Sequence, residues 1–302
     1  MNTYEIYQVD AFTRRRFYGN PAGVVPHAEG LTEDQMQRIA RELNNSETAF
    51  IFPSQSPEEY DVQVRFFTPT KEVPLCGHAT IASHYVRALR GEVGCGRTVQ
   101  KTGAGLLPVD IVRKDGDFAV VMTQGKPEVQ PPLPGETVDR IAQALGVTPA
   151  DLRPDCPVAI ASTGSKKVMV ALKEDTVLHG LHPNMDALIE LSHATGSTGF
   201  YVFTLHPGEE ILLHGRMFGP ANGIPEDPVT GVANGPVGCY LVHYGICREL
   251  ESANALDFTI MQGETLRRDG VMGVHIETEN HQPVLAQITG EAVVAFQAEI
   301  SL

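Results

Sequence analysis

A segment that combines a strand end, a proline, a glycine and a helix start occurs twice in this chain. It reads Glu72-Val73-Pro74-Leu75-Cys76-Gly77-His78-Ala79 in the first half and Glu226-Asp227-Pro228-Val229-Thr230-Gly231-Val232-Ala233 in the second. The segments Arg65-Phe66-Phe67-Thr68-Pro69 and Arg216-Met217-Phe218-Gly219-Pro220 precede the two copies. A pattern that returns after about half of the chain indicates a duplicated domain.

A third pair of similar segments supports the duplication. Glu47-Thr48-Ala49-Phe50 matches Ser197-Thr198-Gly199-Phe200, again about half of the 302 residues apart. We therefore predict two similar domains, residues 1–118 and residues 119–291. The second half has more strands after its helix than the first, so we expect residues 292–302 to return to the first domain as a strand.

Each repeated glycine stands before a run that is able to form one helix, residues 79–90 and 233–244. The first turn of a helix has unpaired N–H groups and a partial positive charge, which attract anions. Gly77 and Gly231 let the backbone approach a ligand closely. We expect both helix N-termini to face one cleft between the domains, a common place for a ligand. The alternative is that each glycine only caps a packed helix.

Composition argues against several classes of function. The net charge is −14 and no basic block occurs, which speaks against nucleic-acid binding. The five cysteines are odd in number and lack a C-x-x-C pair, which speaks against a disulfide framework and a cysteine-rich zinc site. Residues 1–10 alternate instead of forming an apolar signal, and no apolar run reaches about eighteen residues. We expect a cytoplasmic protein that does not contact a membrane.

The hydrophobic pattern predicts many short strands around two buried helices. The two helices after the repeated glycines are apolar over a wide arc, so each should lie inside a sheet. Residues 127–135 contain four prolines and are the best linker candidate. Further elements are predicted as helices over 36–43, 137–145 and 185–193, and as strands over 4–12, 48–52, 62–66, 158–161, 167–172 and 292–300.

Three ionisable side chains are the best candidates for catalysis. Glu47 opens a strand in a segment with little other charge, and a buried carboxylate has a raised pKa suited to general acid–base work. His78 lies in the first turn of the first helix and could donate to a substrate oxygen or relay a proton. Asp227 precedes the second helix, where the dipole favours its ionised form. Each could instead be structural: a solvated glutamate, a histidine bound to a carbonyl, and a capping aspartate.

Cys76 is a possible nucleophile or base because a thiol near a helix N-terminus has a lowered pKa. Its counterpart in the second copy is Thr230, so the chain lacks one half of a two-thiol racemase. His78 and His84 are the nearest pair of histidines in this region, and their spacing is not that of a metal motif. With no G-x-G-x-x-G or Walker pattern in the sequence, we expect neither a metal nor a nucleotide cofactor.

These segments together resemble the phenazine-biosynthesis isomerase family, the PhzF-like proteins. The resemblance rests on Ser46-Glu47-Thr48, Cys76-Gly77-His78-Ala79 and Glu226-Asp227-Pro228-Val229-Thr230-Gly231, and covers essentially the whole chain. Val9-Asp10-Ala11-Phe12, Gly19-Asn20-Pro21 and Gly235-Pro236 also match. The chain looks most similar to the uncharacterised bacterial YddE-type branch.

The resemblance implies an α+β fold of the diaminopimelate-epimerase-like kind, with two duplicated domains that each wrap a barrel-like mixed sheet around a central helix. It implies cofactor-free isomerisation by proton transfer, and a homodimer. It makes Glu47 the proton shuttle and assigns His78 and Asp227 to the substrate. The remaining predicted substrate-binding residues are Asn20, Cys76, Gly77, Thr230 and Gly231.

One position departs from the family pattern. The phenazine enzymes carry a serine directly after the second Thr-Gly pair, where this chain has Val232. The leading hypothesis is therefore a cofactor-independent isomerase of a small carboxylate whose identity stays open. The alternatives are an epimerase or racemase that uses Cys76, and a small-molecule binding protein that has lost turnover.

Overall fold

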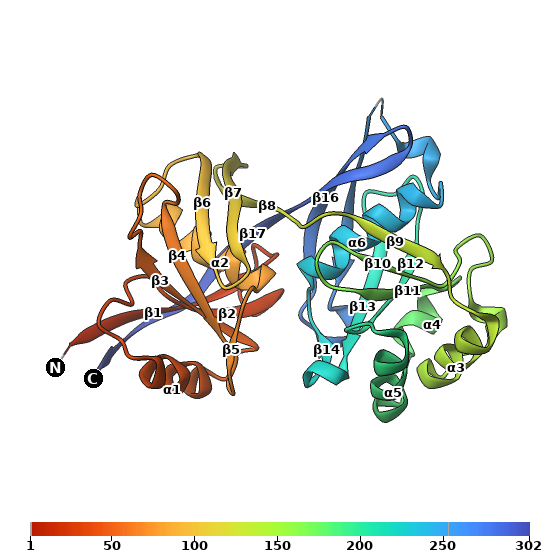
Figure 1. Cartoon of the computed structure of the whole chain (residues 1–302), viewed down its shortest axis with the longest axis horizontal. Helices are drawn as coiled ribbons and strands as arrows, with labels where there is room; N and C mark the ends of the chain where they lie inside the picture. Colours follow the sequence, from red (N-terminus) through yellow and green to blue (C-terminus); the bar gives the residue numbers. More distant parts are fainter. Residues whose placement is uncertain (1, 253) are drawn as a thin grey trace. The chain divides into compact units, whose positions relative to one another are not determined.

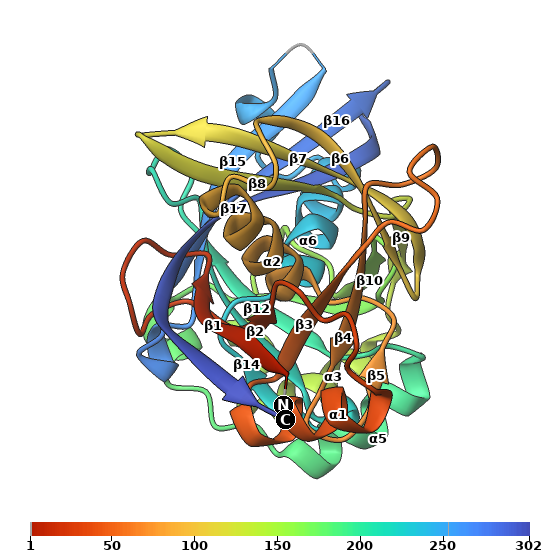
Figure 2. The same ribbon diagram turned by 90° about the vertical axis from the view of Figure 1, so that its left-hand side faces the viewer.

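The computed structural model describes residues 2–252 and 254–302 and divides into two compact units. Unit 1 comprises Met1–Thr123 with Thr289–Leu302, and unit 2 comprises Gln124–Ile288. The division at Gln124 lies a few residues after the boundary expected at residue 119, and the return at Thr289 a few residues before that expected at residue 292. Figures 1 and 2 show the elements of both units in two views.

In unit 1 eight strands form a closed ring around a helix. The ring runs β1–β2–β3–β4–β6–β7–β8–β17 and back to β1, with β2 parallel to β3 and β4 parallel to β6. The elements are β1 (Thr3–Ala11), β2 (Asn20–Val25), α1 (Glu33–Leu43), β3 (Glu47–Pro53), β4 (Val62–Phe67), β5 (Glu72–Val73), α2 (Gly77–Leu89), β6 (Gly96–Thr102), β7 (Gly105–Lys114), β8 (Asp117–Thr123) and the end of β17 (Gln282–Ser301).

The helix inside this ring is α2, which contacts β1, β2, β3, β7 and β8 (Figure 2). All of its residues from Gly77 to Ala88 are buried, as its wide apolar arc predicts. A helix enclosed on all sides must satisfy its polar groups internally. His84 does so by bonding to Gln100, and burial lowers the pKa of this imidazole to about 3, so it stays neutral.

Unit 2 repeats this plan around α6. Its strands follow the order β9–β10–β11–β12–β13–β15–β16–β17, with β11 parallel to β12 and β13 parallel to β15. The elements are β9 (Glu128–Pro132), α3 (Gly135–Leu145), η1 (Pro149–Asp151), β10 (Ala159–Ser162), β11 (Lys167–Ala171), α4 (Asp175–His179), α5 (Met185–Thr195), β12 (Phe200–Leu205), β13 (Leu213–Gly219), η2 (Pro220–Asn222), β14 (Ile224–Asp227), α6 (Gly231–His243), η3 (Arg248–Leu250), β15 (Ala255–Gln262), η4 (Glu264–Leu266) and β16 (Gly270–Glu279).

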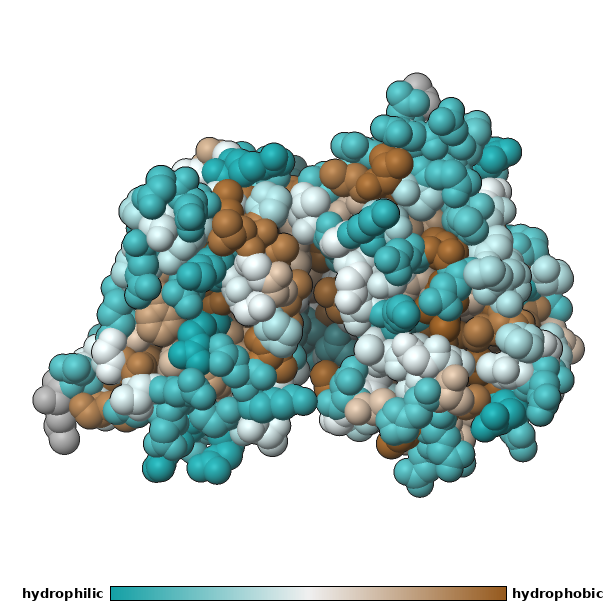
Figure 3. Space-filling model, in the orientation of Figure 1, coloured by the Kyte–Doolittle hydropathy of each residue, from teal (hydrophilic) through white to brown (hydrophobic). Residues whose placement is uncertain are grey.

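The α+β class with a barrel-like sheet around a helix in each unit is confirmed. The helix α6 contacts β9, β10, β11, β15 and β16, and has the same thirteen-residue length as α2. The remaining helices lie outside the sheets: α3, α4 and α5 share an apolar core with β10, β11 and β12, and α1 covers part of the unit 1 ring. The face drawn in Figure 3 is largely hydrophilic, with hydrophobic side chains in small groups.

The twenty-residue strand β17 belongs to both units. It starts in unit 2 after a tight turn at Asn280 and His281, which both have positive φ. Its later residues pair antiparallel with β1, from Ala292 opposite Ala11 to Ser301 opposite Thr3. The segment expected to be the last strand is thus the second part of a longer one.

The predicted linker is wrong. Residues 128–132 form β9, which pairs antiparallel with β10 and has Pro132 opposite Ala159. Proline is tolerated in an edge position because its missing N–H can face away from the partner strand. The proline content was read as a linker signal, but here it marks the first strand of unit 2. Within residues 2–252 and 254–302, no helix combines the length and the apolar character that crossing a bilayer requires.

The two repeated motifs contain the same arginine–glutamate ion pair. Arg65 donates two hydrogen bonds to Glu72, with N–O distances of 2.7 and 2.6 Å. Arg216 does the same to Glu226 at 2.9 and 2.8 Å. Both guanidinium groups also lie over a phenylalanine of their own strand. The duplication therefore preserved a bidentate pair that fixes the chain just before each glycine.

The two pairs differ in burial, which predicts different energetics. The side chains of Arg216 and Glu226 are 8% and 12% exposed, against 24% and 39% for Arg65 and Glu72. Arg216 also donates to the carbonyl oxygens of Leu178 and Leu181. Removal of one partner of a buried pair leaves an uncompensated charge, whereas an exposed pair contributes little.

We therefore expect Arg216→Gln to lower the free energy of unfolding by about 3–5 kcal/mol. The matched variant Arg65→Gln should cost about 1 kcal/mol or less. Urea unfolding followed by circular dichroism measures both. Equal losses for the two variants would show that burial does not set the strength of the pair.

Candidate functional site

In unit 1 the predicted catalytic residues lie together where α2 begins. Glu47 is the first residue of β3, Cys76 is the N-cap residue of α2, and His78 lies in its first turn. His78 Nε2 is 3.5 Å from Glu47 Oε2, and His78 Nδ1 is 3.4 Å from Cys76 Sγ. Ser46 Oγ is 3.3 Å from His78 Nε2. The four side chains form one hydrogen-bonded group, called the Glu47 cluster below.

Burial controls the chemistry of Glu47. Its side chain is 13% exposed and that of His78 is 7% exposed. Desolvation raises the pKa of the Glu47 carboxyl group above its usual value, while hydrogen bonds from Ser46 and Cys76 oppose that shift. A carboxyl group held in this balance can both accept and return a proton.

Asn20 lies on the strand next to Glu47. It is buried at the start of β2, where it pairs with Ala11. Ala22 lies opposite Glu47 in the parallel pair of β2 and β3. Since alternate residues of a strand share a face, Asn20 is on the same face as Ala22 and Glu47. Its predicted role in substrate binding stays a prediction.

In unit 2 the predicted residues surround the start of α6. Thr230 is the N-cap residue, and its hydroxyl donates to Asp227 Oδ2 at 2.5 Å. The amide of Gln262 donates to the Asp227 carbonyl oxygen and to Thr230 Oγ1, and accepts from the Thr230 backbone N–H. Asn234 donates to the Thr230 carbonyl oxygen. This network, called the Asp227 cluster below, fixes the backbone in front of Gly231.

Corresponding residues at the starts of α2 and α6 have the same structural roles. Cys76 and Thr230 are both N-cap residues, and Gly77 and Gly231 are both the first helical residues. Neither side chain makes a capping hydrogen bond to a backbone N–H of the first helical turn. The expectation that both helix N-termini face one cleft concerns the two units together and stays a prediction.

Strand register corrects the predicted counterpart of Glu47. The motif arginine of each unit pairs with a residue of the preceding strand, which is Phe50 in unit 1 and Val202 in unit 2. Glu47 lies three residues before Phe50, so its counterpart is Gly199, three residues before Val202. The match of the two segments pairs Glu47 with Ser197, two residues earlier, because it aligns Phe50 with Phe200 and not with Val202. In either case the second copy has no carboxylate at this place.

Lys167 is a residue that the sequence analysis missed. It is 3% exposed, and its ammonium group donates to Ser165 Oγ at 2.7 Å and to Thr198 Oγ1 at 2.5 Å. Burial lowers its pKa to about 8, and the negative charge of Asp227 opposes this shift. The available signal was the second of two adjacent lysines, Lys166 and Lys167, at the start of an apolar strand, β11.

The position of Lys167 in unit 2 corresponds to that of the strand neighbour of Glu47 in unit 1. The N–H of Val168 donates to the Gly199 carbonyl oxygen, so Lys167 lies beside Gly199 on the neighbouring parallel strand. In unit 1 the residue beside Glu47 is Ala22. The second copy therefore has a buried amine next to the position where the first copy has a buried carboxyl group.

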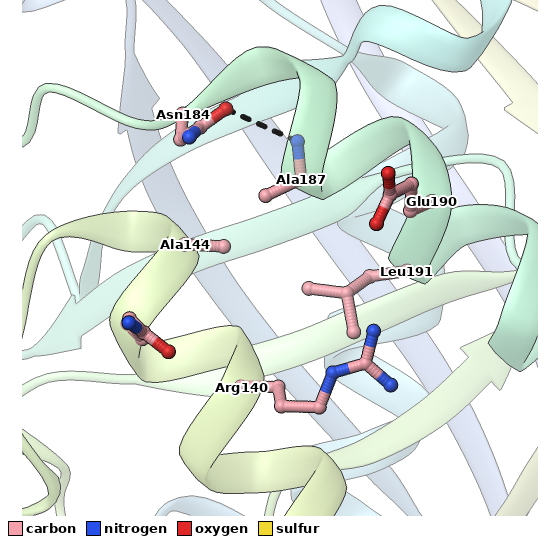
Figure 4. Close-up of a pocket in the computed structure, with 7 residues that line it drawn as sticks. Arg140, Ala144, Asn184, Ala187, Glu190 and Leu191 are labelled. Atoms are coloured by element: carbon pink, nitrogen blue, oxygen red, sulfur yellow. Dashed lines mark hydrogen bonds between the residues drawn. The ribbon is translucent and has the colours of Figure 1, made fainter.

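A separate pocket of about 270 Å³ lies between α3 and α5 of unit 2 (Figure 4). Ala144 and Ala187 leave space between the helices, and Arg140 and Glu190 lie at its side. Asn184 caps α5 by accepting from the Ala187 N–H at 3.1 Å. The pocket is a seam between two packed helices, and the Glu47 and Asp227 clusters lie on other elements.

Comparison with known proteins identifies the family. The profile described as "Phenazine biosynthesis-like protein", PhzC-PhzF, matches residues 9–298. The chain belongs to the PhzF family. An uncharacterized isomerase of Clostridium acetobutylicum is 48% identical over 300 residues, which cover 99% of this chain and 98% of that protein. The uncharacterized isomerase YddE of Escherichia coli K12 is 45% identical, with 98% and 97% covered.

Relatives with a named activity and solved structures agree with this placement. The trans-2,3-dihydro-3-hydroxyanthranilate isomerase of Pseudomonas chlororaphis is 29% identical, with 97% and 98% of the chains covered. A PhzF-family protein of Bacillus anthracis has a TM-score of 0.90 at 31% identity over the whole of both chains. A hydroxyproline epimerase of Agrobacterium vitis, at 13% identity and a TM-score of 0.62 with 99% and 93% covered, shares the fold alone. The chain is an isomerase of the PhzF family with an epimerase-like fold.

The raised pKa of Glu47 predicts a pH-dependent stability. A carboxyl group whose folded pKa exceeds its unfolded pKa costs stability as the pH rises through the folded value, because the buried charge then forms. Glu47→Gln removes that charge and keeps the shape. We expect this PhzF variant to melt roughly a few degrees higher than the parent at pH 8 and at about the same temperature at pH 4.

The exposed Glu42 provides the control. Glu42→Gln should change the melting temperature little at either pH. A melting temperature for Glu47→Gln that is lower than that of the parent at pH 8 would mean that the Glu47 carboxylate stabilises the fold instead of straining it.

Proposed function

We propose that this PhzF-family protein is a cofactor-independent isomerase that moves a proton between two carbons of a small carboxylate. The observation that carries the proposal is the buried Glu47 carboxyl group, within hydrogen-bond reach of a thiol and a hydroxyl and 3.5 Å from a histidine. An ionised Glu47 would take a proton from one carbon and return it to another, so that no atom is gained or lost overall. This chemistry requires only one group that is able to hold the proton in transit.

The other residues of the Glu47 cluster have supporting roles in this proposal. His78 would donate a hydrogen bond to a substrate oxygen, where negative charge develops as the proton leaves. Asn20 and the backbone N–H at Gly77 would hold the substrate, since the start of α2 carries a partial positive charge. Cys76 tunes Glu47 through the hydrogen bond that lowers its pKa.

In unit 2 we propose Lys167 as a group that binds a carboxylate. Lys167 is a buried ammonium group, and a carboxylate is the partner that such a group binds best. The start of α6 at Thr230 and Gly231 adds further N–H groups, and Asp227 would accept from a donor of the substrate. The Pseudomonas chlororaphis relative is named as an isomerase of trans-2,3-dihydro-3-hydroxyanthranilate, which carries a carboxylate. This compound is therefore the first to test.

Val232 gives a reason to look beyond that compound. It is half-buried in the first turn of α6, at the position where the phenazine enzymes carry a serine. A methyl-bearing side chain there replaces a hydroxyl donor, and a site that lacks a donor discriminates strongly against a substrate that needs it. The proposed proton transfer does not use this position, whereas the choice among small carboxylates depends on it.

A second candidate function is epimerisation by Cys76. The specific observation in its favour is the contact of the Cys76 thiol with both His78 and Glu47. Against it stands Thr230, which holds the corresponding cap position in unit 2 and cannot serve as a second thiol base. Variants of Glu47 and Cys76 separate the two functions.

We expect Glu47→Gln to slow deuterium uptake from heavy water into trans-2,3-dihydro-3-hydroxyanthranilate or its product by about 10²–10⁴-fold. Cys76→Ala should keep at least roughly a tenth of the parent rate, because the thiol only tunes the carboxyl group. Proton NMR of the substrate measures the exchange. A Cys76→Ala loss as large as that of Glu47→Gln would favour the epimerase mechanism. Equal exchange in Glu47→Gln and the parent would exclude Glu47 as the shuttle.

We expect Lys167→Met to weaken binding of 3-hydroxyanthranilate, a stable aromatic carboxylate, by at least about tenfold, roughly 1.4 kcal/mol. Binding of its primary amide should change little, because the amide has no charge to pair with the ammonium group. Isothermal titration measures both ligands, and Lys173→Met is the control because Lys173 is an exposed lysine of the same unit. If Lys167→Met weakened binding of the acid and of the amide equally, Lys167 would have a structural role and would not recognise the carboxylate.

A further inference from the structure

Two histidines and a glutamate of unit 2 come together outside the Asp227 cluster. His179 is the last residue of α4, His214 lies on β13, and Glu264 is the first residue of η4. His214 Nδ1 is 2.8 Å from Glu264 Oε2, and His179 Nε2 is 3.2 Å from the same oxygen. The three ligating atoms all lie within 4.8 Å of one another.

Regular elements place these side chains, so their proximity follows from the fold. The strand β13 runs parallel to β15, with His214 opposite Met261. At the end of β15 Gly263 has a φ of 99° and comes so near to the carbonyl oxygens of Pro228 and Arg268 that a Cβ would collide. Only glycine tolerates this conformation and contact at low cost. The turn that Gly263 makes brings Glu264 back over β13.

We propose that His179, His214 and Glu264 bind a divalent transition-metal ion of the zinc class. Two imidazole nitrogens and one carboxylate oxygen are a ligand set that zinc uses in proteins. Bonds of about 2.1 Å in a tetrahedron put the ligand atoms roughly 3.4 Å apart. The N–O distances of 2.8 and 3.2 Å from the two histidines to Glu264 need only a small expansion to reach that spacing.

The surroundings also suit a cation. The rings of His206 and His214 are 5.1 Å apart, and His206 Nε2 is 3.0 Å from Asp175 Oδ1. The carboxylates of Glu264 and Asp175 therefore lie on either side of the two histidine rings and supply negative charge near the site. The side chains of His179 and Glu264 are 38% and 27% exposed, which leaves a path for the ion and room for a water ligand.

The same three elements support the second repeated motif. Thr265, next to Glu264, donates to Glu226 Oε1 at 3.1 Å. Leu178, next to His179, accepts from Arg216 through its carbonyl oxygen. An ion at this site would therefore join both ends of the buried Arg216–Glu226 pair. Its role would be to hold the chain in front of α6, and the proton-transfer chemistry proposed for Glu47 does not require it.

Titration of the EDTA-treated and dialysed full-length protein with ZnCl₂ tests the proposal. We expect one Zn²⁺ per chain, and an increase in melting temperature on binding because the ion binds the folded state alone. His179→Ala, His214→Ala and Glu264→Gln should each weaken binding at least about tenfold, the smallest loss typical even for residues that only support a ligand. His179 lies at a partly exposed helix end, so its variant is the one most certain to fold.

Two controls locate the ion. His275→Ala changes a histidine of unit 2 that also contacts an acid, with Nδ1 2.7 Å from Asp257 Oδ1, and it should leave binding unchanged. Glu47, Cys76 and His78 form another group with ligand spacing, so Co²⁺ is added in place of Zn²⁺ to detect a thiolate ligand. A near-ultraviolet thiolate-to-cobalt band, or unchanged zinc affinity in the His179 variant, would overturn the proposal. Anomalous diffraction at the zinc edge between His179, His214 and Glu264 would establish it.

Discussion

The paired arginine and glutamate before each repeated glycine are the contact on which both halves of this protein depend. Each pair joins the strand that leads into the motif to the short strand that leaves it, and so determines where the chain turns into its central helix. In unit 1 the turn brings Cys76 and His78 to Glu47. In unit 2 it brings Thr230 to Asp227. The two copies thus kept the same arginine–glutamate pair while the residues around it diverged.

The two copies diverged in charge at comparable places. The first keeps a buried carboxyl group at the start of β3, and the second has a glycine there with a buried ammonium group on the next strand. Both groups cost desolvation free energy, which partners offset only in part. Proteins keep such groups where function needs them, because a packed apolar residue would stabilise the fold more. The proposed roles of Glu47 in proton transfer and of Lys167 in charge recognition give each copy a reason to keep such a group.

Much of the architecture could be predicted because its signals are local. The helices α2 and α6 begin at Gly77 and Gly231, two residues before the predicted starts at 79 and 233, since a wide apolar arc after a glycine leaves few alternatives. The strand start at Glu47 was likewise visible. The prolines of β9 misled because an edge strand tolerates them, and α4 was missed because five residues give no periodicity. Lys167 and Gly199 depend on pairing between distant strands, which the order of residues does not contain.

The shared strand β17 has a consequence for how the protein is made. The ring of unit 1 closes only when β17 pairs with β1, which joins Thr3 to Ser301. During synthesis the first 123 residues therefore lack one wall of their barrel until residues 289–302 have left the ribosome. The edges of β1 and β8 stay open for that time, and an open edge is a template for pairing with another chain. Contacts between such distant positions also form slowly. Unit 2 consists of one continuous segment, so it is free to fold first. The end of β17 then completes the barrel of unit 1, most of which was synthesised earlier.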